Sequence, residues 1–299
     1  MAFALFLLAG NACAATIAVV LSDNTPFYQE TADAIESGLG RDHTIVRIQV
    51  SHLGQSESAL NNARIIVTIG VKASSNVAQR RGRTPILAVM VPRSWHEEVG
   101  KSLLSEGGRM NGTIFIDQPL SRQFHLIKSA LPSVTKVGVV LGKETVGRLA
   151  ELDRQAKAHR VNLVSASLDS NSRLVETIER VLDEAEVLLL AFPDAEVLSR
   201  TTAQSVFMTS YRFRDPVVGY SQSLSRAGAL LAVYSTPAQI GRQTSEVLSS
   251  YLDRDKMSAV HWPQYFSVSV NEHVARSLDI MVPSEQVLLK RVQDAESHD

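Results

Sequence analysis

The feature that most constrains this chain is a repeated alternation between short apolar segments and longer amphipathic stretches. Residues 16–21 (TIAVVL) and 65–69 (IIVTI) are apolar almost throughout, whereas a strand with one face in water would alternate apolar and polar residues. The stretches between such segments have helical periodicity: in 171–183 the apolar residues recur at i, i+4, i+7 and i+8. Strands buried on both faces and separated by helices predict an α/β fold with parallel sheets.

The alternation runs through the chain twice, which predicts two doubly wound parallel sheets and therefore two lobes. The first series predicts strands at 16–21, 45–50, 65–69, 85–89 and 111–116, with helices at 26–39 and from residue 73 onward. The second predicts strands at 136–142, 162–168, 186–192, 216–220 and 229–235, with helices at 119–131, 146–158, 171–183, 199–212 and 237–254. The two series divide near 117–119, and short direct segments between the lobes would act as a hinge.

The amino terminus differs from the rest of the chain. Residues 1–14 are apolar and end in small residues, which is typical of a secretory signal segment, and the stretch is too short to span a membrane. We therefore expect an exported protein; the alternative is a buried first strand or helix. Cys13 is the only cysteine, so a chain cleaved after Ala14 would have neither disulfides nor cysteine-bound zinc. A lipid anchor on Cys13 is the other interpretation of this residue.

Composition and motifs exclude several classes of function. The net charge is −1 without a basic stripe, so nucleic acid is not expected as a partner. GVVLGKE (138–144) has too few residues between its glycines for a phosphate loop, and GYSQS (219–223) lacks the second glycine of a nucleophile elbow. The eight histidines are scattered, with none at metal-ligand spacing. We expect no enzyme, cofactor or metal; a hydrolase or isomerase would have only Glu144 and Asp194 as an acid–base pair.

What remains is a set of polar residues at the carboxyl ends of the predicted strands, where open α/β sheets bind their ligands. The residues that we predict as ligand contacts follow strands of both series: Asn24, Ser74, Ser75, Glu144, Asp194 and Ser221. Phe27, Tyr28 and Trp95 lie near the same edge and would stack on an apolar or aromatic part of a ligand. For each of these aromatic residues alone, packing in the core is the alternative.

Two of these positions bear on the charge of a ligand. At Gly70 a buried strand runs directly into a helix, whose first amide groups lack intrahelical partners and carry the positive end of the helix dipole. This turn would suit a carboxylate or another anion, with Ser74 and Ser75 as hydroxyl donors; the alternative is that Ser74 caps the helix. Asp194 would complement the turn by binding an ammonium group, or would instead cap the helix that follows it.

Five segments, taken in their order along the chain, resemble a known family. They are IIVTIGVKASSNVA (65–78), QPLSRQFHLIKSALPSVTKVGVVLGKE (118–144), EVLLLAFPDAEVLS (186–199), GALLAVYSTPAQIGRQTSEVLSSYL (228–252) and PQYFSVSVNEHVARSLDIMVP (263–283). The chain resembles the ABC transporter substrate-binding proteins with the type I periplasmic-binding fold, some of which are receptors for tryptophan or other amino acids. Arg93 and Lys72 depart from the family pattern and leave room for a more anionic ligand.

The resemblance implies a periplasmic solute-binding protein of an ABC-type uptake system. It implies lobe one at 15–117 and 237–258, and lobe two at 118–236 and 259–299. A small polar ligand, amino-acid-like or anionic, would bind in a cleft that closes by hinge motion. The expected partner is a membrane permease, and the expected state is a monomer. The alternative is a periplasmic sensor module that passes its closed form to a signalling partner.

Overall fold

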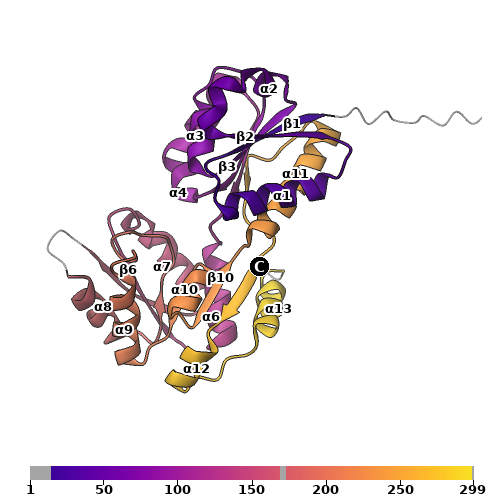
Figure 1. Cartoon of the computed structure of the whole chain (residues 1–299). Helices are drawn as coiled ribbons and strands as arrows, with labels where there is room; N and C mark the ends of the chain where they lie inside the picture. Colours follow the sequence, from indigo (N-terminus) through magenta and orange to yellow (C-terminus); the bar gives the residue numbers. More distant parts are fainter. Residues whose placement is uncertain (1–14, 169–172, 298–299) are drawn as a thin grey trace, which may run out of the picture. The chain divides into compact units, whose positions relative to one another are not determined.

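The computed structural model describes residues 15–168 and 173–297 of the chain. The predicted signal segment at 1–14 and the first residues of the predicted helix 171–183 lie outside this part. The chain forms two compact units (Figure 1). Unit 1 runs to Ile116 and resumes over Pro237–Gln264; unit 2 takes Asp117–Thr236 and the chain from Tyr265 on.

Unit 1 is built on a parallel sheet whose described strands have the order β11-β5-β4-β3-β1-β2. The strands are β1 (Thr16–Leu21), β2 (Thr44–Gln49), β3 (Ile65–Ile69), β4 (Ile86–Val91), β5 (Asn111–Phe115) and β11 (Val260–His261). The central strands β3 and β4 are buried along their whole length, because helices cover both faces of the sheet. This double cover is the reason that these strands are apolar without alternation.

The helices of unit 1 divide between the two faces of its sheet. They are α1 (Pro26–Leu39), η1 (Val50–Gln55), α2 (Glu57–Asn62), α3 (Val71–Ala78), α4 (Arg93–Trp95), the π-helical η2 (His96–Gly100), α5 (Lys101–Ser105), η3 (Glu106–Gly108) and α11 (Pro237–Arg254). On one face α1 and α11 lie side by side, with Ile35 and Ile240 in the same core cluster (Figure 1). On the other face α3 and α5 contribute Val77 and Leu104 to a second cluster.

Unit 2 repeats this arrangement with one change. Its described strands have the order β12-β10-β9-β8-β6-β7, and all pairs are parallel except β10 with β12. The strands are β6 (Lys136–Leu141), β7 (Asn162–Ser167), β8 (Leu188–Leu189), β9 (Val217–Gly219), β10 (Leu231–Tyr234) and β12 (Ser267–Val270). The antiparallel edge strand arrives after the excursion of the chain through α11 of unit 1.

Helices also cover both faces of the sheet in unit 2. They are α6 (Leu120–Ala130), η4 (Val146–Arg148), α7 (Leu149–Ala158), α8 (Leu174–Leu182), α9 (Ala203–Phe213), α10 (Gln222–Ala227), α12 (Glu272–Leu278) and α13 (Glu285–Glu296). Phe124 of α6 and Leu288 of α13 belong to the cluster on one face, and Ile178 of α8 and Val206 of α9 to the cluster on the other. No helix of the described chain is both long and apolar enough to cross a membrane.

These two sheets confirm the predicted α/β fold class with two doubly wound lobes, and three details correct the prediction. The second sheet is not wholly parallel, because β12 runs antiparallel to β10. Residues 259–264, which the prediction assigned to lobe two, belong to unit 1, because β11 pairs with β5. The strand predicted at 186–192 is regular only over Leu188–Leu189, although the Leu190 amide still donates to the Val218 carbonyl.

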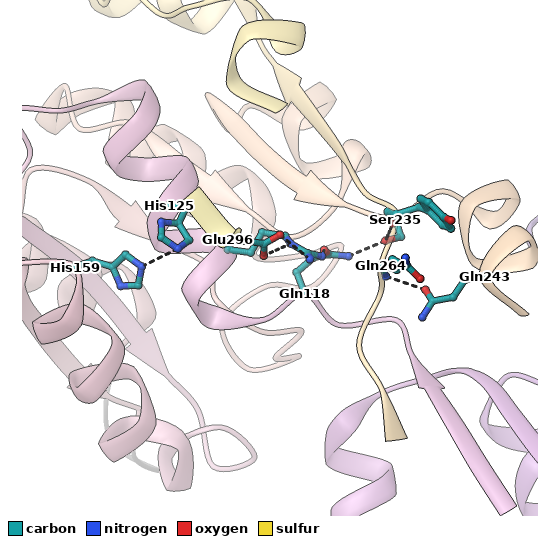
Figure 2. Close-up of polar contacts among 9 residues, drawn as sticks. Gln118, His125, His159, Ser235, Gln243, Gln264 and Glu296 are labelled. Atoms are coloured by element: carbon teal, nitrogen blue, oxygen red, sulfur yellow. Dashed lines mark hydrogen bonds and ion pairs between the residues drawn. The ribbon is translucent and has the colours of Figure 1, made fainter. Parts of the chain in front are cut away.

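Polar side chains in unit 2 hold together the segments at which the chain crosses between the units. Gln118 donates from Nε2 to Ser235 Oγ at 2.9 Å, and Ser235 Oγ donates to the Tyr265 carbonyl at 2.6 Å (Figure 2). Gln118 Oε1 accepts from Arg122, whose guanidinium donates two further bonds to the Glu296 carboxylate in α13. The charge on buried Arg122 is therefore paired, and all three crossing segments are fixed to the body of unit 2.

Unit 1 fixes the last of its crossing segments in a similar way. Gln243 of α11 donates from Nε2 to the Trp262 carbonyl at 2.9 Å and accepts at Oε1 from the Gln264 amide at 2.8 Å (Figure 2). Because one side-chain amide bonds both a backbone carbonyl and a backbone N–H, the segment after β11 is ordered without a regular ladder.

Close packing of α1 on α11 predicts the effect of adding one methyl group. A Cβ on Gly241 would lie 2.5 Å from Ala34 Cβ and 2.6 Å from the Thr31 carbonyl oxygen, so the helices would have to separate. We expect Gly241→Ala to lower the free energy of unfolding by about 1–3 kcal/mol, measured by urea denaturation. Gly54→Ala is the matched control, since a Cβ there meets no atom within 4 Å. Equal stability of the two variants would contradict this account of the interface.

A second prediction concerns Asp215, which precedes β9. An apolar hollow of about 170 Å³ there is lined by Phe207, Tyr211 and Val217. Burial, and then the charge of Glu186, raises the pKa of the Asp215 carboxyl to about 6. The unfolded chain titrates this group near pH 4, so its contribution to stability is present below about pH 4 and is lost as the pH rises through 6.

Removing this charge should stabilise the protein only at the higher pH. We expect Asp215→Asn to raise the free energy of unfolding by about 1 kcal/mol at pH 8 and to leave it unchanged at pH 4, because the half-exposed carboxylate is partly screened by solvent. Thermal denaturation at the two pH values measures the difference. A gain of the same size at pH 4 would show that the effect does not come from ionisation.

Candidate functional site

Both sheets have their switch point in the same place. In each sheet, the second strand of the series lies on one side of the first strand and the third strand lies on the other side. The direction in which successive strands are added to the sheet therefore reverses beside the first strand. The loops that leave the carboxyl ends of the strands on either side of such a point go to opposite faces, which opens a crevice. The two half-sites are thus the loops after β1 and β3 in unit 1 and the loops after β6 and β8 in unit 2.

A serine links the two loops of the first half-site. Ser22, directly after β1, is buried; its Oγ donates to the Ile69 carbonyl at 2.8 Å and accepts from the Ala73 amide at 2.9 Å. It therefore satisfies one of the first amides of α3 from a neighbouring loop, as a capping residue would. Gly70, at the turn, has φ of 86°, and a Cβ there would lie 2.6 Å from Tyr28 Oη, so only glycine fits this position.

The two predicted serine contacts differ in what they do. Ser74 is fully buried, with its hydroxyl 2.8 Å from Thr68 Oγ1 and 2.9 Å from the Gly70 carbonyl that it donates to. It supports the turn from within. It neither caps α3, whose N-cap residue is Gly70, nor lies on the surface of the half-site. Ser75 is half-buried and accepts from Trp95 Nε1 at 3.2 Å. Lys72 in the first turn is exposed.

Aromatic and polar side chains line the loop after β1. Asn24 is exposed and accepts at Oδ1 from Gln29 Nε2 at 2.5 Å and from Gln49 Nε2 at 3.4 Å. Phe27 is 42% exposed and tilts against Tyr28, with ring centroids 6.4 Å apart. Burial, and then the charge of Asp23, raises the pKa of the Tyr28 phenol, so the group stays neutral and is a hydrogen-bond donor.

Trp262 extends this edge of the first sheet. It follows β11, and its ring meets Phe115 at the end of β5 edge-on, with centroids 5.2 Å apart. The Arg93 guanidinium, after β4, lies over the Trp262 ring at 5.5 Å and pairs with Glu97 at 2.5 Å. Sequence reasoning missed Trp262, because it assigned 259–264 to the other lobe. Its local signal was limited to an aromatic residue directly after Val260 and His261.

In the second half-site Asp194 links the two loops. Its Oδ2 accepts from the Gly142 amide at 2.8 Å and from Thr145 Oγ1 at 2.5 Å, and its Oδ1 accepts from the Glu196 amide at 3.0 Å. A Cβ on Gly142 would lie 2.6 Å from Oδ1, so the glycine lets the loop approach the carboxylate. Asp194 is buried and already satisfied within unit 2. It holds the loops together and does not cap the helix that follows, because α9 begins at Ala203 with Thr202 as its N-cap residue.

The other predicted residues of the second half-site are more accessible. Glu144 is exposed, and Ser221 is half-buried and caps α10 by accepting from the Leu224 amide at 3.3 Å. Tyr220, which sequence reasoning did not select, directly precedes Ser221 after β9. Burial, and then the charge of Asp194, raises the pKa of its phenol. The carboxyl ends of β6, β8 and β9 therefore combine acidic groups with neutral hydroxyl donors.

The two half-sites differ in electrostatic character. The first presents the positive end of α3 and Lys72, beside Asp23 in the loop after β1. The second presents Glu144, and Glu196, whose carboxylate pairs with Lys143 at 3.7 Å. Among the described residues no group of three or more His, Cys, Asp or Glu could hold a metal ion. Such surfaces can bind polar and charged groups of a solute through hydrogen bonds and charge.

Comparison with protein families decides what kind of protein carries these half-sites. A family model described as ABC transporter substrate binding protein matches residues 53–294. The chain belongs to this family. The match includes β3 and the switch point of the second sheet, whereas β1 and β2 precede it, and it confirms the resemblance seen in the sequence. No curated protein matches the chain.

Solved structures support the same architecture for this substrate-binding protein. A ligand-free, open substrate-binding protein with adhesive properties from Clostridium difficile is 16% identical, with a TM-score of 0.73 over 91% of this chain and 97% of that one. An ABC domain in complex with L-Trp from Streptococcus pneumonia (16% identity, TM-score 0.59) and a conserved domain protein from Vibrio cholerae (20%, 0.58) each align over 93% of this chain and 98% of theirs. At such identities the likeness concerns the fold, which is the two-lobed type I periplasmic-binding fold.

Loss of the Ser22 hydroxyl tests the link at the first switch point. Ser22→Ala leaves the Ala73 amide and the turn at Gly70 without their side-chain partner, so we expect the free energy of unfolding to fall by about 1–2 kcal/mol. Chemical denaturation measures this loss. Ser51→Ala, at an exposed serine of the same unit, is the control and should change stability by less than about 0.5 kcal/mol. A Ser22→Ala variant as stable as the control would refute the linking role.

Proposed function

We propose that this chain is the solute-binding component of an ABC-type uptake system and binds a small polar molecule. The observation that carries the proposal is the duplicated half-site: in a chain of the substrate-binding family, both sheets present polar loops at their switch points. One ligand would contact both half-sites and favour a closed form through its greater affinity for that form. The family supports a solute-binding role in general, and the ligand class is part of the proposal.

The charges of the half-sites favour a ligand that carries an anionic group. A carboxylate or similar group would meet the first-turn amides of α3 and the Lys72 ammonium. Tyr28 and Trp262 offer ring surfaces for an apolar part of the ligand. A cationic or hydroxyl group would meet Glu144 and the hydroxyl of Tyr220. The L-Trp bound to the Streptococcus pneumonia neighbour has this kind of chemistry, and an amino-acid-like or anionic solute is proposed here.

The predicted site residues take different parts in this proposal. Asn24, Ser75, Glu144 and Ser221 are proposed as contacts of the ligand, since each retains some exposure. Ser74 and Asp194 are proposed as supports, which hold the loops on which the contacts lie. No catalytic step is assigned to any of them.

The cellular setting follows from the same proposal. A signal segment at 1–14 would direct the chain across the inner membrane to the periplasm, where it would act as a monomer. Its partner would be the permease of the transporter, which recognises the ligand-bound form. Ligand binding by the purified chain does not depend on its export or on its recognition by the permease.

A thermal-shift screen tests ligand binding directly. Residues 15–299 are screened against amino acids, small carboxylates, nucleosides and sugars. A ligand at one hundred times its dissociation constant should add about 2.7 kcal/mol to the free energy of unfolding. We expect a hit among the first two classes. Hits confined to sugars or nucleosides, or the absence of any hit, would count against an amino-acid-like or anionic solute.

Two exposed residues then test the half-sites. We expect Lys72→Ala in unit 1 and Glu144→Ala in unit 2 each to weaken the hit about tenfold, measured by calorimetric titration, because each removes a charged contact. The control is Gln79→Ala, at the opposite end of α3 from the half-site, which should bind as the unmodified chain does. A ligand whose affinity survives both charge removals would bind elsewhere.

A further inference from the structure

The apolar hollow beside Asp215 lies at the edge of the second sheet that is opposite to the half-site. Asp215 and Pro216 directly precede β9, and Gly228 precedes β10, so these lining residues lie at the amino ends of two neighbouring parallel strands. The half-site of unit 2 is built on loops at the carboxyl ends of the strands. The hollow therefore shares no residue with the site proposed for the solute.

The size and the lining of the hollow suit a small apolar group. Helix α9 contributes Phe207, Met208 and Tyr211 to its walls, and α12 contributes Val274 and Leu278. Met208 and Tyr211 are more than half exposed, so the hollow is open to solvent. Its volume is about 170 Å³, and an apolar cavity of about 150 Å³ is large enough to bind benzene. A single six-membered ring would fit.

One acidic side chain interrupts these apolar walls. Among the described residues that line the hollow, Asp215 alone is charged. Neither a cation nor a hydrogen-bond donor of the described chain pairs with its carboxylate; the Ser210 hydroxyl donates to the Asp215 backbone carbonyl instead. A half-buried carboxylate without a partner loses hydration and gains nothing in return. The charge of Glu186 adds to this cost. A cation in the hollow would supply the missing partner.

The same surroundings discriminate against other kinds of ligand. The charges of Asp215 and Glu186 would repel an anion. A neutral hydrocarbon would fill the hollow but would leave the Asp215 carboxylate unpaired and less hydrated. A cation gains twice, because the faces of aromatic rings such as those of Phe207 and Tyr211 also attract an ammonium group.

We propose that this hollow binds a small organic cation, with an apolar body among Phe207, Val274 and Leu278 and an ammonium group paired with the Asp215 carboxylate. The site is distinct from the two half-sites and does not depend on the proposed function. Benzylamine, which joins one aromatic ring to a primary ammonium, has the required size and charge and serves as the probe.

A titration of the full chain with benzylamine at pH 8 tests where the cation binds. It is followed by NMR of isotope-labelled methionine methyl groups. Met208 lines the hollow, whereas Met90 and Met257 belong to unit 1 and are internal controls. We expect a saturable shift of the Met208 signal, which is assigned by its loss in Met208→Leu. An unchanged Met208 signal, including the case in which only the signals of unit 1 shift, would overturn the proposal.

The same titration tests whether the Asp215 charge is required. We expect benzylamine to bind Asp215→Asn at least about tenfold more weakly, because a hydrogen bond between two charged groups is lost. This variant should fold, since removing the unpaired charge stabilises the chain. Asp253→Asn, at an exposed aspartate of unit 1, is the matched control and should bind as the unmodified chain does.

A neutral probe makes the same comparison without any variant. Benzyl alcohol has the shape of benzylamine and lacks its charge, so we expect it to bind the unmodified chain at least about tenfold more weakly. Equal affinity of the two probes, or equal affinity of benzylamine for Asp215→Asn and for the unmodified chain, would refute the pairing with Asp215. The result is independent of whether a solute ligand is found for the half-sites.

Discussion

The structure depends on holding two diverging loops together at each switch point. A parallel sheet that winds both ways must send neighbouring loops to opposite faces, and the backbone groups left there have no ladder to join. In unit 1 the Ser22 hydroxyl spans the opening between β1 and β3; in unit 2 the Asp194 carboxylate spans that between β6 and β8. Without these links the loops that carry the exposed polar groups would have no fixed position.

In this arrangement, residues of the same chemical kind have different roles: some hold the loops in place, and others are exposed where a ligand could contact them. Ser74 and Ser75 are neighbours on one helix, yet one is turned into the interior and the other is half-exposed, since adjacent helical positions point about 100° apart. Asp194 and Glu144 differ in the same way, because four donors surround the first while the second extends into water. Selectivity for a solute would thus reside in the exposed members, which can change without loosening the loops.

Much of the fold could be predicted because the burial of a strand determines which of its residues are apolar, and this pattern is visible in the sequence. A strand covered on both faces must be apolar throughout, so β1, β3, β4 and β6 were found close to their true ends. Short segments were harder: β11 has two residues and β8 has two, and neither is long enough to show a period. The mistaken assignment of 259–264 and the omission of Trp262 both follow from β11, whose membership of a sheet is settled only by its pairing with β5.

The sequence by itself determined the fold class, the duplication and the edge of each sheet at which polar groups gather, because these follow from local periodicity and from the turn that ends each strand. It also placed Gly70 and Asp194 at that edge. The tertiary structure alone decided which hydroxyl accepts from the first turn of α3, which carboxylate is satisfied and which histidines meet. Those outcomes depend on contacts between residues that are 34 to 52 positions apart, such as His125 with His159 and Gly142 with Asp194, and no local pattern encodes such distances.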